Sequence, residues 1–288
     1  MNYPAGENHK QSYKLFRAFS FPDEKRIVLP AGMTVRIFSL RNPSLAGKSI
    51  LFFTDTHIRL GCVKNYFSLS GTPKEWRGTQ WIEKALLEAI KEFSPEYLLF
   101  GGDLAAYMNA YPDAIGMLSH LHAEKGKFAV FGNWDKKRRS WFPFHVMEQM
   151  YAEAGWRILC NESAEMEDSL QIYGLDDEKI GIPNFYGSGD RSAFSILMSH
   201  NPDAAVSLSP DQLAHFQLIL CGHTHGGQIR IPGFGAIKAS SKYWKRFEYG
   251  TYRNTETGTE MIVSAGIGAT CFPFRFNCPP EIIVLRFT

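Results

Sequence analysis

Side chains of the types that bind metal ions stand directly after five short apolar runs of this 288-residue chain. Each run has the length and apolar character of a buried strand. The residues that follow the five runs are Asp55 with His57, Asp103, Asn133, His200, and His223 with His225. In α/β sheets the carboxyl ends of strands are where sites are built. We therefore predict that these seven side chains meet in one metal site.

Spacing within two of these groups supports the prediction. Asp55 and His57 are two residues apart, as are His223 and His225. In an extended segment such residues point to the same side, so each pair is expected to reach one metal centre. Nitrogen and oxygen ligands suit Mn, Fe, Zn, Ni or Co better than a thiolate site would, and we expect Mn.

Seven ligands are too many for a single catalytic ion that must keep an open position. Two divalent ions that share Asp103 divide the ligands evenly. The first ion would take Asp55, His57, Asp103 and His225, and the second Asp103, Asn133, His200 and His223. Two such ions, about 3.5–4 Å apart, can activate a bridging water and clamp a phosphoryl group. The pattern thus predicts a hydrolase of P–O bonds, with Asp103 and Asn133 as catalytic residues.

The order of these motifs resembles the calcineurin-like metallophosphoesterase family. Its pattern runs D-x-H, G-D, G-N-H-D/E, a lone His and G-H-x-H. Here it reads Asp55-Thr56-His57, Gly102-Asp103, Gly132-Asn133-Trp134-Asp135, His200 and Gly222-His223-Thr224-His225. The bacterial branch with a G-H-T-H-G-G-Q signature is the most similar. This resemblance implies an α/β fold, a four-layer α/β/β/α sandwich with two mixed sheets, and the same metal ligands.

Trp134 departs from the family pattern, which has His after Asn in the third motif. In the family that His helps stabilise the transition state or protonate the leaving group. An indole N–H donates a hydrogen bond but cannot act as an acid. General-acid help is worth roughly 10²–10⁴-fold, and poor leaving groups need it most. We therefore expect Trp134 to be a third catalytic residue, one that favours phosphodiester or pyrophosphate bonds over alkyl monoesters.

The UDP-2,3-diacylglucosamine pyrophosphatases of lipid A synthesis are a branch that also lacks this His, and they supply the leading specific expectation for the substrate. A general phosphodiesterase acting on cyclic nucleotides or small diesters is the alternative. The second alternative is a non-catalytic, metal-stabilised protein that binds a membrane or a partner.

A basic run follows the third motif and comprises Lys136, Lys137, Arg138 and Arg139. We predict that this run and Arg275 bind a second substrate phosphate or face anionic lipid. The other reading of such a run is a solvated face. The expected partner is a phosphate-containing small molecule or a lipid-linked substrate. A net charge of +2 argues against nucleic acid.

Strand and helix patterns alternate in the first half of the chain, and strands dominate the second, which favours a mixed α/β core. We expect an N-terminal arm over 1–24 and one domain over 25–288. Predicted helices cover 80–93, 113–122 and 144–154. Predicted strands cover 26–29, 34–40, 49–54, 97–100, 127–131, 158–159, 169–173, 194–198, 218–220, 228–231, 260–264 and 281–287.

The five cysteines form no C-x-x-C pair, which favours a reducing compartment. The first residues lack the apolar stretch of a signal peptide. No run approaches the ~20 apolar residues of a spanning helix. We therefore expect a cytoplasmic protein. The predicted arm mixes Lys10, Lys14 and Arg17 with aromatic residues, a composition that suits peripheral contact with the inner membrane face. The other reading is that these aromatics pack on the body of the protein.

Overall fold

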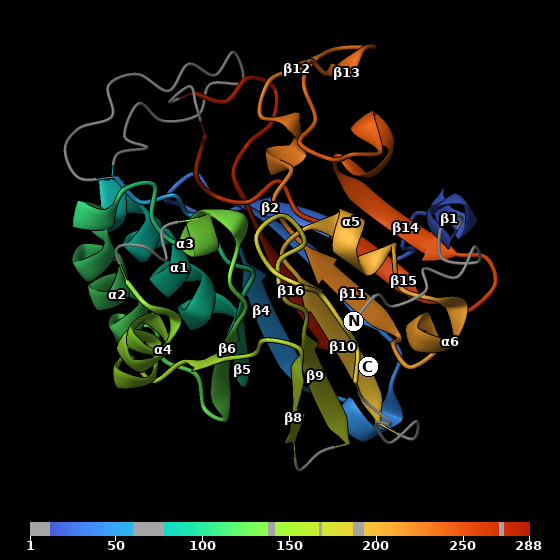
Figure 1. Ribbon diagram of the computed structural model, residues 1–288, viewed down its shortest axis with the longest axis horizontal. Coiled ribbons are helices and arrows are strands. Elements are labelled where there is room, and N and C mark those ends of the chain that lie inside the picture. The colour runs from blue at the N-terminus through green and yellow to red at the C-terminus, as the bar shows by residue number, and fades with distance from the viewer. Residues whose placement is uncertain (1–11, 60–77, 138–141, 167–168, 187–192, 271–273) are drawn as a thin grey trace, which may run out of the picture.

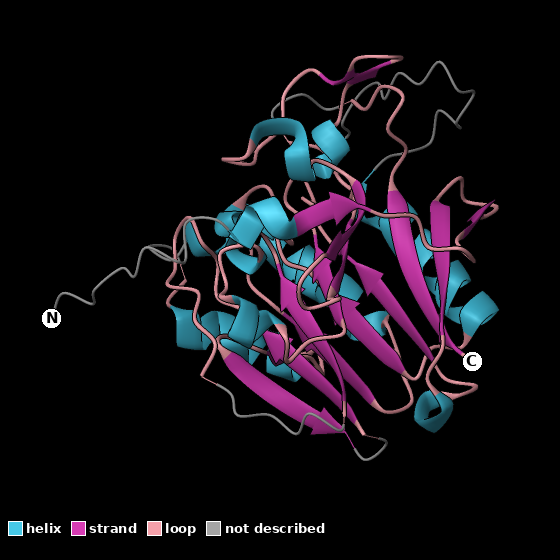
Figure 2. Ribbon diagram, turned by 90° about the vertical axis from the view of Figure 1, so that its right-hand side faces the viewer, coloured by secondary structure: helices cyan, strands magenta, loops and turns pink. Residues whose placement is uncertain are grey.

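Two mixed seven-stranded sheets pack face to face, with helices on both outer faces (Figure 1, Figure 2). The structure is a computed structural model, and it describes residues 12–59, 78–137, 142–166, 169–186, 193–270 and 274–288. A two-stranded hairpin, formed by β12 (Arg230–Ile231) and β13 (Gly235–Ala236), is separate from the large sheets. The predicted four-layer α/β/β/α sandwich is confirmed.

The first sheet has the strand order β2-β3-β16-β4-β5-β6-β7. Its strands are β2 (Lys25–Val28), β3 (Thr34–Leu40), β16 (Glu281–Phe287), β4 (Ser49–Phe53), β5 (Tyr97–Phe100), β6 (Gly126–Ala129) and β7 (Arg157–Ile158). Three helices pack on its outer face, α1 (Gly78–Phe93), α2 (Tyr111–His120) and α4 (Phe144–Glu153). β4, β5 and β6 run parallel, so their carboxyl ends lie at one edge.

The second sheet has the order β1-β14-β15-β11-β10-β9-β8. Its strands are β1 (Phe16–Ala18), β14 (Gly250–Asn254), β15 (Glu260–Val263), β11 (Leu218–Cys221), β10 (Phe194–Ser199), β9 (Leu170–Gly174) and β8 (Glu162–Met166). The short helices α5 (Pro202–Ala205) and α6 (Pro210–Leu213) lie on its outer side. β9, β10, β11 and β15 are parallel.

The strands that lead to the site are apolar on both faces because each face contacts a different layer. In β4, Ile50 and Phe52 face the core between the sheets, whereas Leu51 and Phe53 pack under the helices. All four side chains are at most 1% exposed. Uninterrupted apolar runs of this kind, rather than alternating ones, are typical of strands covered on both sides.

Residues 12–24, the described part of the predicted N-terminal arm, pack on the body of the protein. β1 pairs with β14 at the edge of the second sheet. Phe16 and Phe21 are buried, and the ring of Tyr13 stacks on Tyr243 with centroids 4.3 Å apart. Residues 1–11, including Lys10, lie outside the described residues. The described aromatics therefore contribute to the core.

The strands that the sequence did not reveal are β1, β8, β13 and β14. β8 has the sequence ESAEM and β14 the sequence GTYRN, so both lack the apolar runs that marked the other strands. β8 lies at a sheet edge. Such strands depend on pairing with a neighbour rather than on intrinsic propensity. None of the described helices has both the length and the apolar character needed to span a bilayer.

Candidate metal centre

The seven predicted ligands lie where the carboxyl ends of both sheets converge. Asp55 and His57 follow β4, Asp103 follows β5, and Asn133 follows β6. From the other sheet, His200 follows β10, and His223 with His225 follows β11. Parallel pairing brings the strand ends together within each sheet, and face-to-face packing joins the two edges.

Backbone conformation at the site differs from the extended geometry that the two-residue spacings suggested. Asp55, His57, Asp103, His223 and His225 all have positive φ, between 41° and 69°. Residues other than glycine rarely adopt this backbone region, which costs of order 1–3 kcal/mol at each residue. The expectation of extended pairs was therefore wrong, although the side chains still converge.

Two glycines let the ligand loops approach one another closely. A Cβ at Gly132 would lie 2.1 Å from Oδ1 of Asp103, and one at Gly222 would lie 2.3 Å from Oδ2 of Asp55. No side chain fits in that space. The glycines beside the predicted ligands thus permit close contact between the loops.

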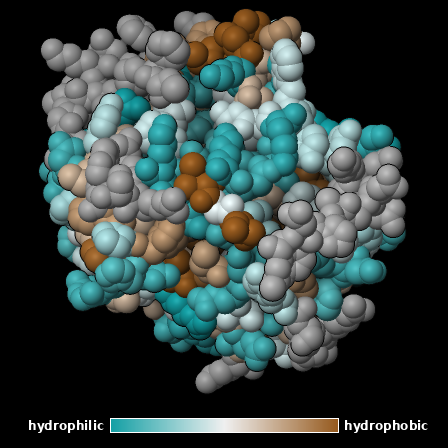
Figure 3. Space-filling model, in the orientation of Figure 1, coloured by the Kyte–Doolittle hydropathy of each residue, from teal (hydrophilic) through white to brown (hydrophobic). Residues whose placement is uncertain are grey.

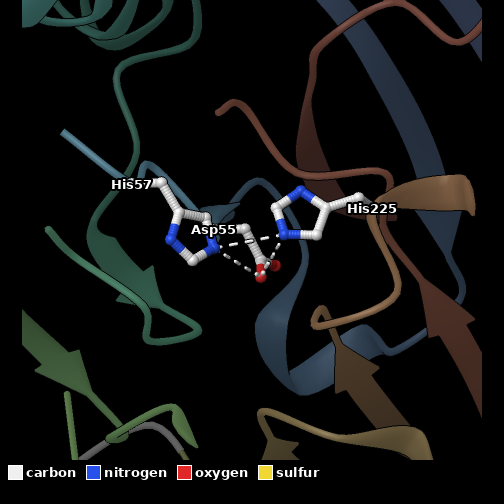
Figure 4. A group of neighbouring side chains, drawn as sticks. All are labelled: Asp55, His57 and His225. Carbon is white, nitrogen blue, oxygen red and sulfur yellow. Dashed lines mark hydrogen bonds and ion pairs between the residues drawn. The ribbon is translucent and has the colours of Figure 1, made fainter. Parts of the chain in front are cut away.

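Asp55, His57 and His225 form the first group (Figure 4). The Nε2 atoms of the two imidazoles are 3.1 Å apart, and Oδ1 of Asp55 lies 3.4 Å from Nε2 of His225. Oδ2 of Asp55 accepts hydrogen bonds from the His223 amide and from the hydroxyl of Thr54. Oδ1 is buried and has no hydrogen-bond partner among the described residues. A bound cation would satisfy this oxygen.

Asp103, His200 and His223 form the second group. Nε2 of His200 lies 3.3 Å from Oδ2 of Asp103 and 3.2 Å from Nδ1 of His223. Oδ1 of Asn133 is 3.2 Å from the same Nε2. Oδ2 of Asp103 also lies 3.3 Å from Nε2 of His57, so this carboxylate faces both groups.

The outer ring nitrogens of the second group lie against backbone carbonyls. Nδ1 of His200 is 2.8 Å from the Gly101 oxygen, and Nε2 of His223 is 3.1 Å from the Ser240 oxygen. A carbonyl only accepts hydrogen bonds, so a neutral ring must carry its proton on this outer nitrogen. The inner nitrogens then face each other with lone pairs, an arrangement that a shared cation stabilises. Such partners commonly orient metal-binding imidazoles.

The carboxylates and imidazoles of the centre differ in their protonation. Burial by itself raises the pKa of Asp103, but His200 and His57 lower that pKa well below its usual range. Burial lowers the pKa of His200, yet the charge of Asp103 raises it to about 10. Burial also lowers the pKa of His223 and His225 to about 3, so these imidazoles are neutral at physiological pH. Ionised carboxylates and neutral imidazoles are the forms that bind metal, so a bound cation would displace the proton of His200.

Asp135 holds two ligand loops together, a role that sequence reasoning missed. Its Oδ2 accepts hydrogen bonds from the amides of Asp103 and Gly132, and its Oδ1 accepts one from the amide of Leu104. Burial, helped by the charge of Asp103, raises the pKa of Asp135 to about 6. The fourth residue of the third motif was the available signal, because it is part of the family pattern.

The structure places the predicted phosphate-binding residues differently from one another. Lys136 is 4% exposed and pairs with Asp176, whereas Lys137 is exposed and lies over the Trp134 ring, 5.6 Å from its centroid. The remaining two of the run, Arg138 and Arg139, lie outside the described residues. Of the described pair, only Lys137 faces solvent.

Arg275 lies inside the protein behind the first group. Its guanidinium donates hydrogen bonds to the carbonyls of Ala265 and Gly268, and its Nη2 lies 3.3 Å from Nδ1 of His225. Only 2% of Arg275 is exposed. Burial is the main cause of the low pKa of His225, and the positive charge of Arg275 lowers it further. The geometry therefore points to a positioning residue, in contrast to the expected substrate contact.

Trp134 borders the site from the β6 side. Its indole meets the His57 imidazole edge to face, with ring centroids 5.4 Å apart and planes at 83°. Its backbone amide donates a 2.7 Å hydrogen bond to Oδ1 of Asp103. The side chain at this position therefore contacts one predicted ligand while the backbone supports another.

A mixed α/β sandwich with two adjoining Asp/His groups at its strand ends defines a metal-dependent phosphoesterase. The model of the calcineurin-like phosphoesterase family matches residues 48–227, and the chain belongs to this family.

Curated relatives extend the similarity beyond that segment. The uncharacterized metallophosphoesterase YkuE of Bacillus subtilis is 31% identical over 83% of this chain and 78% of its own. The uncharacterized protein YpbG of the same organism is 29% identical over 69% and 73%. Phosphodiesterase YaeI of Escherichia coli is 27% identical over 68% and 71%.

Proposed function

We propose that the protein hydrolyses phosphodiester or pyrophosphate bonds with a dinuclear metal centre. In this proposal the first ion is held by Asp55, His57, Asp103 and His225, and the second by Asp103, Asn133, His200 and His223. One observation carries it. Oδ2 of Asp103 lies 3.3 Å from an imidazole nitrogen of each group, which is the position of a bridging ligand.

Bound divalent ions would supply Lewis-acid stabilisation of the phosphoryl charge and an activated water. The residues of the chain hold that chemistry in place. Trp134 and Asp135 fix Asp103 through backbone hydrogen bonds. The Asn133 amide points its oxygen at His200 and presents no ionisable group. Rigid ligands of this kind lower the reorganisation needed during reaction.

The leaving group is expected to depart without a proton from residue 134. An indole cannot protonate an alkoxide, so alkyl monoesters should be poor substrates. The relative YaeI is named a phosphodiesterase, which supports phosphodiesters as the substrate class. UDP-2,3-diacylglucosamine, cleaved as in lipid A synthesis, remains the specific prediction for a pyrophosphate substrate. Cyclic nucleotides and small diesters are the alternative.

A substrate panel tests this proposal. Purified protein is loaded in turn with Mn, Fe, Zn, Ni or Co, and products are followed by ³¹P NMR. The panel contains bis(p-nitrophenyl) phosphate, a cyclic nucleotide, UDP-2,3-diacylglucosamine and β-glycerophosphate. We expect metal-dependent cleavage of a diester or pyrophosphate and little cleavage of the monoester. A clear preference for β-glycerophosphate would contradict the argument from Trp134, and no cleavage with any metal would favour a non-catalytic binding role.

A further inference from the structure

A cavity of about 300 Å³ adjoins the first metal group. His225 and Thr224 line it on the side of the metal centre, and Ile229, Ile237 and Thr270 line it elsewhere. Because His225 belongs to both, the cavity and the first metal group adjoin at this residue.

Two polar side chains of the lining, those of Gln228 and Thr224, are engaged within the protein. The side chain of Gln228 donates to the Phe274 carbonyl and accepts from the Thr270 amide. The hydroxyl of Thr224 donates to the Glu248 carbonyl. None of the described lining residues is aromatic. The described lining therefore offers no aromatic surface on which a nucleobase could stack.

Apolar surface continues from the cavity to the β12–β13 hairpin. Ile237 lines the cavity and is 52% exposed, while Ile231 and Phe234 on the hairpin are 45% and 60% exposed. In Figure 3 hydrophobic atoms gather at the top of the molecule, where Figure 1 places this hairpin. Apolar patches beside a site commonly mark ligand grooves.

The segment that follows the hairpin, which also lines the cavity, is tied to the metal centre. The Ser240 carbonyl contacts Nε2 of His223, and Asp203 accepts hydrogen bonds from the Ser241 hydroxyl and the Lys242 amide. Lys238 lies in the same segment, is exposed, and forms no ion pair within the described chain. The cavity thus has a fixed apolar interior and one cationic group at its edge.

We infer that this cavity binds an aliphatic chain of the substrate, so that the enzyme acts on lipid phosphodiesters. The inference rests on the proposed function and names the substrate class of that site. The reacting phosphate lies at the metal centre, the chain runs past Ile229 and Ile237, and the hairpin extends the apolar surface outward. Lys238 is placed to contact anionic groups of the lipid.

Hydrolysis of a homologous series tests the inference. The substrates are methyl, butyl and octyl p-nitrophenyl phosphate, and kcat/KM is measured with metal-loaded protein. Burial of each methylene corresponds to at most about a fourfold gain. We expect kcat/KM to rise by at least tenfold from methyl to octyl, and the octyl/methyl ratio to fall severalfold in Ile237→Asn. The matched control is Ile182→Asn, because Ile182 is 77% exposed and does not line the cavity.

Binding provides a readout that does not depend on turnover. Calorimetry with octyl phosphate and methyl phosphate should show tighter binding of the octyl compound, with the difference reduced in Ile237→Asn and retained in Ile182→Asn. Equal affinities and a flat rate series would overturn the cavity assignment while leaving diester hydrolysis intact. Tighter octyl binding without hydrolysis of any diester or pyrophosphate would support the cavity and refute the proposed function.

Discussion

The backbone amide of Trp134 and the carboxylate of Asp103 are joined by a 2.7 Å hydrogen bond. This bond occupies Oδ1 and leaves Oδ2 facing both His57 and His200. Position 134 therefore supports the proposed bridging ligand through its backbone, whatever side chain it carries. A substitution at residue 134 can therefore change the side chain near the leaving group without removing the backbone bond that supports the metal centre.

Trp134→His should raise activity toward alkyl phosphate monoesters by about 10–100-fold, because an imidazolium can protonate the leaving oxygen. The hydrogen bond to Asp103 is a backbone bond and should persist. The measurement is kcat/KM for β-glycerophosphate and for bis(p-nitrophenyl) phosphate, with metal content determined on each sample. Trp134→Phe is the matched control, since it keeps an aromatic ring and supplies no acid. Equal monoesterase rates in all three proteins would remove this residue from the explanation of specificity.

Asn133→Ala should lower kcat by about 10³-fold, the change that roughly 4 kcal/mol of lost transition-state stabilisation produces. The variant removes an oxygen 3.2 Å from Nε2 of His200, at the second group. Metal analysis should show about one ion per chain in place of two. Turnover equal to that of the parent protein, at full metal occupancy of the parent, would contradict the two-metal proposal.

Arg275→Lys should weaken metal binding by about 10–100-fold, the range found when an outer partner of a ligand is lost. Lysine keeps the charge but cannot reproduce the hydrogen bonds to Ala265 and Gly268 that hold the segment behind His225. Titration with metal, combined with KM at saturating metal, separates the two roles. A raised KM with unchanged metal affinity would instead support the substrate contact expected from the sequence.

Removal of metal should destabilise the fold. Five predicted ligands have positive φ, and Asp55 has a buried oxygen that a cation would satisfy. At a hundredfold excess of metal over Kd, binding contributes about 2.7 kcal/mol. That corresponds to a rise in Tm of roughly 5–10 °C for a chain of this size. Thermal unfolding with EDTA and with added Mn measures it, and identical Tm values would argue against specific binding.

Glu24→Gln should destabilise the protein by about 2 kcal/mol at pH 7, because it leaves the buried guanidinium of Arg36 with one carboxylate fewer. Burial raises the pKa of Glu24, but Arg36 and Arg26 outweigh it and lower the pKa below its ordinary value. The stabilisation is therefore present above the unfolded-state pKa and is lost as pH falls through the folded-state pKa. Denaturant unfolding at pH 7 and pH 4, in EDTA, should show a smaller difference at pH 4.

Sequence alone predicted the ligands and the strands that carry them. Each of the seven residues follows a largely apolar run, and these runs form strands of the two sheets; β4 and β11 are covered on both faces. Buried strands have this character whatever the topology, so the pattern was readable. Edge strands such as β8 could not be predicted in this way, because polar residues interrupt the apolar pattern and pairing with a neighbouring strand decides the conformation.

Residue types and their order therefore determined the α/β class, the strand ends and the chemistry of the ligands. Only the tertiary structure decided how the ligands converge. The left-handed backbone of Asp55 and His223 depends on hydrogen bonds between loops that are far apart in sequence. The position of Arg275 also depends on tertiary structure, because no local sequence pattern indicates that it is buried behind His225. Long-range packing fixes these positions, whereas strand character arises from local sequence.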